Sequence, residues 1–127
     1  MKLIIAKLDY IFWLWIGALF VGALIPGLGV GRVTIESFSF RADYLCHALA
    51  FFGIVAIFTM AQLNDIVIFK RFAWIKLILL CIVLGISIEV LQYFIPGRSF
   101  NLFDILSNLV GLSFGLLLFR VVALLRD

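Results

Sequence analysis

Residues 88–115 read IEVLQYFIPGRSFNLFDILSNLVGLSFG, and this stretch places polar side chains at helical spacings within apolar runs. Glu89 and Gln92 stand three residues apart before a proline-glycine turn, and Asp104 and Asn108 stand four residues apart after it. Residues three or four apart share one face of a helix. An ionisable side chain inside a membrane segment costs several kcal/mol unless the protein compensates it. The stretch therefore predicts two membrane helices that carry a functional polar face.

The composition of the whole chain indicates a membrane protein. Of its 127 residues 66% are hydrophobic and 13% are charged, and the mean hydropathy is +1.29. A soluble domain of this size could not cover so much apolar surface. Four stretches are long enough to cross a hydrocarbon core of about 30 Å: residues 9–25, 44–63, 74–95 and 103–118. We expect an all-α membrane protein with one four-transmembrane-helix domain over residues 1–127.

The basic residues predict the orientation of this bundle. If both termini are cytoplasmic, seven of the ten lysines and arginines lie inside and three lie outside, as the positive-inside rule requires. The inside set is Lys2, Lys7, Lys70, Arg71, Lys76, Arg120 and Arg126, and the outside set is Arg32, Arg41 and Arg98. We expect a multi-pass membrane protein with both termini in the cytoplasm. The net charge of +3 is then explained by the orientation of the helices in the membrane. We expect no nucleic-acid partner, because the basic residues do not form the pattern of a nucleic-acid-binding groove.

The outer end of the second predicted helix adds Asp43 and His47, which are four residues apart. Three helices thus offer acid, base and amide groups at one depth. We predict a polar pocket open to the outer side of the membrane, formed by Asp43, His47, Glu89, Gln92, Arg98, Asp104 and Asn108. The connection over residues 26–42 could form a short hairpin or an interfacial loop.

Small residues continue the polar stripes toward the cytoplasmic side. Gly111 and Gly115 follow the stripe of Asp104 and Asn108, and Gly85 lies on the stripe of Glu89. Small residues at such spacings let helix backbones approach closely. We expect these three glycines to pack helices together below the pocket.

Several of the polar residues have a structural alternative. Asp43 could cap the second helix, and Asn101 with Asp104 resembles a capping pair. Arg98 could reach lipid phosphates or pair with Asp104. Glu89 lies more than one turn below the interface, where capping is not expected to explain it, and its expected partner is Arg98 or His47.

The chain carries the pattern Asp43-xxx-His47, followed by Glu89-xx-Gln92-xxx-Pro96-x-Arg98-xxxxx-Asp104-xxx-Asn108-xx-Gly111-xxx-Gly115. This pattern resembles the VanZ-like membrane proteins over roughly residues 41–119. Family members often carry a lysine after the aspartate and a tyrosine four residues beyond the histidine, where this chain has Tyr44 and Phe51. The resemblance implies a small multi-helix protein of the cell envelope, placed in the cytoplasmic membrane of a bacterium. Some members are linked to glycopeptide antibiotic resistance. It implies no particular mechanism.

Three classes of function fit the predicted pocket. The preferred one is binding of a polar lipid head group or a lipid-linked envelope precursor, with Arg98 on a phosphate. Glu89, Gln92 and Asn108 would set the hydrogen-bond geometry, and the first turn of the fourth helix would offer backbone N–H groups. The second class is an enzyme that uses His47 or Glu89 as acid or base, although no HExxH or nucleophile motif supports it. The third is a structural subunit of an envelope complex or a homo-oligomer.

The enzyme class raises the question of a metal ion. Asp43, His47 and Glu89 are the candidate ligands for a divalent metal. A pair four residues apart plus one further residue is a permissive match to a metal site. The sequence therefore assigns no catalytic residue and predicts no metal or other cofactor.

Overall fold

The computed structural model describes residues 5, 7–26, 32–35 and 38–126. The helices in this part of the chain are α2 (Leu8–Leu24), α3 (Ala42–Leu63), α4 (Ala73–Gln92) and α5 (Leu102–Arg126). Two strands, β1 (Arg32–Ile35) and β2 (Phe38–Arg41), lie between α2 and α3. The four expected helices are therefore present.

Two helix ends differ from the expected bounds by more than two residues. α4 ends at Gln92 and not at residue 95, because the chain tightens into turns before Pro96, with the N–H of Phe94 bonded to the carbonyl of Leu91. A proline disfavours helical backbone in the residue before it. α5 continues past residue 118 to Arg126, because the aliphatic run resumes after Arg120 and contains no helix-breaking residue.

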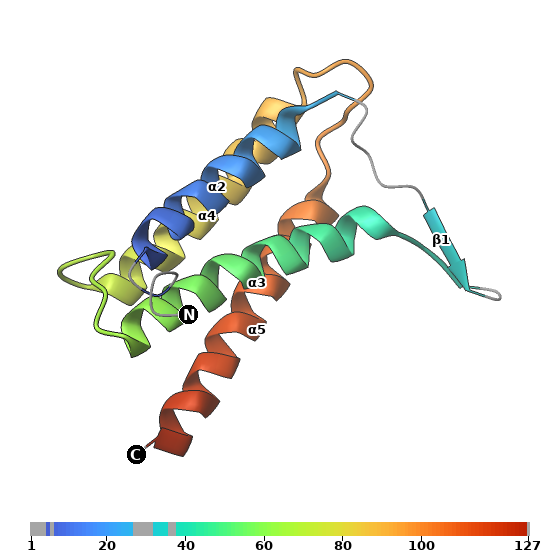
Figure 1. Cartoon of the computed structure of the whole chain (residues 1–127). Helices are drawn as coiled ribbons and strands as arrows, with labels where there is room; N and C mark the ends of the chain where they lie inside the picture. The colour runs from blue at the N-terminus through green and yellow to red at the C-terminus, as the bar shows by residue number, and fades with distance from the viewer. Residues whose placement is uncertain (1–4, 6, 27–31, 36–37, 127) are drawn as a thin grey trace.

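The connection between α2 and α3 contains a short hairpin, one of the two forms the sequence left open. β1 and β2 pair antiparallel, with Val33 opposite Phe40 and Thr34 opposite Ser39. β2 leads directly into α3 (Figure 1).

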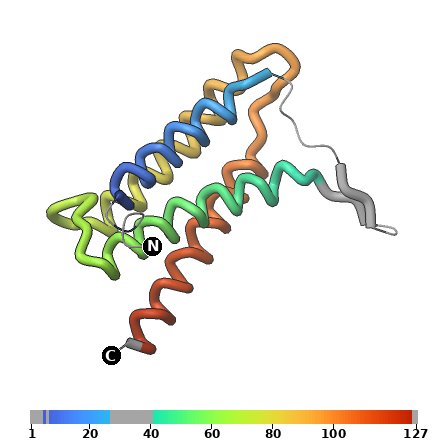
Figure 2. The backbone as a smooth tube through the Cα atoms, in the orientation of Figure 1, coloured from blue at the N-terminus to red at the C-terminus, as the bar shows by residue number. Residues whose placement is uncertain are grey.

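The four helices form two pairs. α2 lies along α4, and α3 and α5 cross one another (Figures 1 and 2). α3 packs most extensively against α5 and also contacts α2, while α4 contacts both α2 and α5. We call the end of the bundle where α2 and α4 end and α3 and α5 begin the site end. The first turn of α2 and the last turn of α5 lie away from the site end.

The helices have the length and composition of membrane spans. α3, α4 and α5 are long and apolar enough to cross a membrane, and α2 is a shorter apolar helix of 17 residues. Large apolar side chains are exposed on every helix, among them Leu14, Leu79 and Phe114. Such surfaces suit a lipid environment. The chain is a multi-pass membrane protein, and spanning by α2 stays a prediction, as does the cytoplasmic placement of both termini.

Glycines on α5 bring its backbone against α3. A Cβ atom added to Gly111 would overlap the backbone carbonyl of Ala48, and one added to Gly115 would lie 2.6 Å from Cβ of Val55. On α4, a Cβ at Gly85 would lie 3.1 Å from Nδ2 of Asn108. The Gly111 contact fixes the height of α3 relative to α5, since only glycine permits this approach.

Candidate functional site

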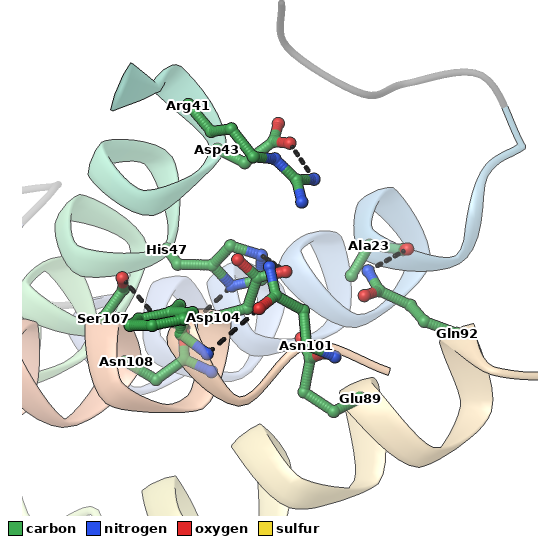
Figure 3. A network of polar contacts seen from close by, with 11 residues as sticks. Ala23, Arg41, Asp43, His47, Glu89, Gln92, Asn101, Asp104, Ser107 and Asn108 are labelled. Atoms are coloured by element: carbon green, nitrogen blue, oxygen red, sulfur yellow. Dashed lines mark hydrogen bonds and ion pairs between the residues drawn. The ribbon is translucent and has the colours of Figure 1, made fainter. Parts of the chain in front are cut away.

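Polar side chains from three helices meet at the site end (Figure 3). We call the following five residues the polar cluster: His47 on α3, Glu89 on α4, Asn101 just before α5, and Asp104 and Asn108 on α5. Glu89, Asp104 and Asn108 are only 0%, 5% and 3% exposed. The structure thus brings together most of the side chains that the sequence placed at one depth.

Glu89 joins α4 to the start of α5. Its Oε2 accepts a hydrogen bond from the backbone N–H of Asn101 at 3.2 Å. The Oδ1 of Asn101 accepts from the N–H of Phe103 at 3.1 Å and so caps α5. In a capping box the carboxylate of Asp104 would accept a hydrogen bond from the N–H of Asn101. Here the acceptor is Glu89, which lies on α4. The expectation that capping cannot explain Glu89 is therefore wrong, and neither Arg98 nor His47 is its hydrogen-bond partner.

His47 is oriented by Asn108. Its Nδ1 lies 3.0 Å from Oδ1 of Asn108, and because an amide oxygen only accepts, Nδ1 donates in this pair. The other ring nitrogen, Nε2, lies 3.9 Å from Oδ2 of Asp104, which is too long for a hydrogen bond. The imidazole therefore presents Nε2 to the acidic side of the cluster.

Asp43 lies at the start of α3 and forms an ion pair with Arg41, which was not predicted from the sequence. Its Oδ2 accepts from Nη2 of Arg41 at 2.7 Å, and this hydrogen bond raises the pKa of Arg41 above its ordinary value. Arg41 and Asp43 are two positions apart in the sequence, and this closeness of opposite charges could have predicted the ion pair. Arg41 thus joins the site as a residue that the sequence analysis had assigned only to topology.

Gln92 connects α4 to the end of α2. Its Nε2 donates to the backbone carbonyl of Ala23 at 2.8 Å, in the last turn of α2 where carbonyls lack a helical donor. Gln92 is 2% exposed, and its bond to Ala23 is partly buried. The side chain positions two helices and also lines two cavities at the site end.

Two cavities adjoin at the site end and share Asp43, Gln92 and Arg98 in their walls. The polar cavity has a volume of about 450 Å³ and is lined by Arg41, Asp43, Gln92, Pro96, Gly97, Arg98, Ser99 and Asp104. The apolar cavity has a volume of about 190 Å³. Its remaining walls are Ala18, Leu19, Gly22, Ala23, Cys46, His47, Ala50, Phe51 and Ile88. The two cavities lie side by side, one apolar and one polar, and together they are complementary to an amphiphilic ligand.

Arg98 lines the polar cavity with a charge that no acidic side chain of the described residues neutralises by an ion pair. In the part of the chain that the structure describes it makes no ion pair within 4.0 Å, so it pairs with neither Asp104 nor Glu89. Arg41, in contrast, is held by Asp43. The start of α5 offers little to an anion, because the N–H groups of Asn101, Phe103 and Asp104 are already bonded within the protein.

The candidate metal ligands differ in one member from the set that the sequence suggested. His47, Glu89 and Asp104 each offer a ligand atom within 4.8 Å of the others. Asp104 stands where Asp43 was expected, because the close approach of α5 to α3 brings Asp104 alongside His47 while Asp43 bonds Arg41.

Comparison with known proteins agrees with the resemblance noted in the sequence. A family model described as VanZ/LLP1 matches residues 2–124, which is more of the chain than the motif alone covers. No curated protein and no solved structure matches the chain.

Proposed function

The chain belongs to the VanZ/LLP1 family, and from this premise we propose that it binds a phosphate-bearing lipid at the site end. The lipid phosphate lies in the polar cavity against Arg98, and the first part of the lipid chain lies in the apolar cavity. The observation that carries the proposal is the shared wall of the two cavities, with an arginine in it that forms no ion pair with any of the described residues.

The charges of the polar cavity favour an anion at Arg98 and not at the polar cluster. Asp43 and Arg41 neutralise one another, which leaves the guanidinium of Arg98 as a fork of donors suited to phosphate oxygens. Asp104 would repel an anion if it were ionised and uncompensated. Binding of an anion therefore needs a compensating charge beside Asp104.

The apolar cavity suits a slim hydrocarbon chain. Ala18, Gly22 and Ala23 on α2 and Ala50 on α3 are small, so the two helices leave room between them. A pocket that covers an apolar ligand with a few placed polar groups at one end is the usual form of a small-molecule site. Polyprenyl phosphates, the lipid carriers of envelope precursors, have this shape.

A thermal-shift assay on delipidated protein in detergent tests the proposal. A polyprenyl phosphate at 100 times its Kd should stabilise the protein by about 2.7 kcal/mol, and the polyprenol of equal chain length should stabilise it less at the same concentration. Arg98→Gln should remove the difference, whereas Arg120→Gln, an equivalent change at the other end of α5, should not. Equal stabilisation by phosphate and alcohol, unaffected by Arg98→Gln, would refute head-group binding. Stabilisation by inorganic phosphate alone would show that the lipid chain is unimportant.

A second candidate function is acid–base chemistry on the bound lipid. His47, with its orienting Asn108 and a buried carboxylate 3.9 Å away, is the observation in its favour. Release of inorganic phosphate from a polyprenyl phosphate, abolished by His47→Gln, would support it.

A further inference from the structure

Three side chains of metal-ligating type converge inside the polar cluster from three different helices. The ligand atoms of His47 on α3, Glu89 on α4 and Asp104 on α5 all lie within 4.8 Å of one another. Glu89 is 0% exposed and Asp104 is 5% exposed. Two buried carboxylates and a partly buried imidazole are thus held together.

Each acid keeps a buried oxygen that no hydrogen bond satisfies. Among the described residues, Oε1 of Glu89 and Oδ1 of Asp104 have no hydrogen-bond partner, although the other oxygen of Glu89 accepts from Asn101. The amide Nδ2 atoms of Asn101 and Asn108 are buried without a partner as well. Leaving a buried polar atom unbonded costs free energy, and such atoms in a native structure call for an unseen partner. A cation between the two carboxylates would satisfy both acid oxygens at once.

The charge of the cluster points to a cation. In the described part of the chain neither Glu89 nor Asp104 forms an ion pair with a lysine or arginine within 4.0 Å. Two buried carboxylates without compensation are strongly destabilising. A protonated His47 would supply one positive charge at most, and its Nε2 lies beyond hydrogen-bond distance of Asp104.

His47 has the second-sphere support of a metal ligand. Histidine ligands almost always donate their other ring N–H to a carbonyl or carboxylate, which fixes the tautomer. Nδ1 of His47 donates to Oδ1 of Asn108 at 3.0 Å, and this leaves Nε2 with a free lone pair directed at the acids.

We propose that His47, Glu89 and Asp104 bind a divalent transition-metal cation of the zinc or manganese class. Nε2 of His47 and one oxygen from each carboxylate supply three ligands, as in open metal sites that keep a position for a water or a substrate. Ligands of one such ion lie about 2.0–2.2 Å from it and hence roughly 3–3.5 Å apart, so small side-chain rotations close the group. Asp104 also lines the polar cavity, which gives the open position access to that cavity.

The inference does not depend on lipid binding. The metal site concerns the described residues of the cluster alone, and metal binding can be measured without any lipid. A bound cation would, however, supply the compensating charge beside Asp104 that an anionic ligand of the polar cavity requires.

Cobalt titration of the chelator-treated protein in detergent, followed by visible absorption, tests the site directly. We expect one Co²⁺ per chain, with d–d bands of nitrogen and oxygen coordination and no thiolate charge-transfer band. Zinc should displace the cobalt. Glu89→Gln and Asp104→Asn should each weaken binding at least tenfold, while Asp65→Asn, the same change on the exposed α3–α4 turn, should bind as the parent protein does.

Three results would overturn the site. One is the absence of Co²⁺ binding by the parent protein at millimolar metal, a measurement that needs no variant. Another is unchanged affinity in Glu89→Gln and Asp104→Asn variants that elute as monodisperse species. The third is a thiolate band in the parent spectrum, which would assign the metal to cysteine and refute the proposal even if the variants do not fold.

Discussion

The carboxylate of Glu89 on α4 accepts the backbone N–H of Asn101, the residue that caps α5. An acid that the sequence places deep in an apolar helix thus supplies half of the capping box of the next helix. This hydrogen bond links the two ends of the α4–α5 connection, which contains Arg98. Glu89 therefore has two roles that can be separated, one through Asn101 and one through its unbonded Oε1.

Replacing Glu89 separates these roles. In the presence of EDTA, Glu89→Leu should accelerate amide hydrogen exchange at Asn101 about tenfold, equivalent to about 1.4 kcal/mol, because the N–H loses its acceptor. Glu89→Gln keeps an amide oxygen and should leave the exchange rate close to that of the parent protein. Equal exchange in all three proteins would show that the bond does not hold α5.

The pair of His47 and Asn108 should behave as one unit. In a double-mutant cycle with EDTA present, His47→Phe and Asn108→Leu should each lower Tm, and the double variant should lose less than the sum. The expected coupling is about 0.5–3 kcal/mol, because each single change leaves a buried polar partner unbonded. Combining His47→Phe with Asn64→Leu, at the far end of α3, should be additive. Additivity in both cycles would contradict the orienting role of Asn108.

Gly111 should be the most sensitive glycine of the bundle. Gly111→Ala should lower the free energy of unfolding by about 1–3 kcal/mol or more, since the added methyl group overlaps the Ala48 carbonyl. Gly17→Ala, on the exposed face of α2 with no atom within 4 Å of the added Cβ, should be neutral or stabilise by about 0.5–1 kcal/mol. Thermal unfolding in detergent distinguishes the two. Similar Tm values for both variants would mean that α3 and α5 can move apart.

The orientation of the bundle can be tested with reporter fusions. Seven of ten basic residues lie on one side if both termini are cytoplasmic. A fluorescent protein at the C-terminus should therefore fluoresce, and a phosphatase at the same position should be inactive. A phosphatase inserted at Gly97, at the site end, should be active. The reverse pattern would invert the topology and place the site on the cytoplasmic side.

Much of the fold could be predicted from the sequence, because long apolar runs determine where helices lie. Helical spacing also identifies which polar residues share a face, and four of the seven residues of the predicted pocket lie in the polar cluster. Spacing on one helix does not fix the height of that helix against another, which here depends on the contact of Gly111 with Ala48. For that reason Asp43 was expected beside His47 and Glu89, where the structure has Asp104.

Hydrogen bonds between different helices could not be predicted from the sequence either. Nothing in the spacing of Glu89 and Asn101 shows that a side chain of one helix caps the next one. The same holds for Gln92 and Ala23, which lie far apart in the chain and meet only because α2 runs along α4.

The central claim is that one lipid occupies both cavities with its phosphate at Arg98, and site-specific photo-crosslinking tests it most directly. A photoreactive amino acid at Leu19, in the apolar cavity, is compared with one at Leu79, which is exposed on α4. Mass spectrometry identifies the attached lipids. We expect Leu19 to capture a phosphate-bearing lipid selectively and to lose it in the Arg98→Gln variant, while Leu79 captures bulk lipids in both backgrounds. The same mixture of lipids at both positions, independent of Arg98, would contradict the account.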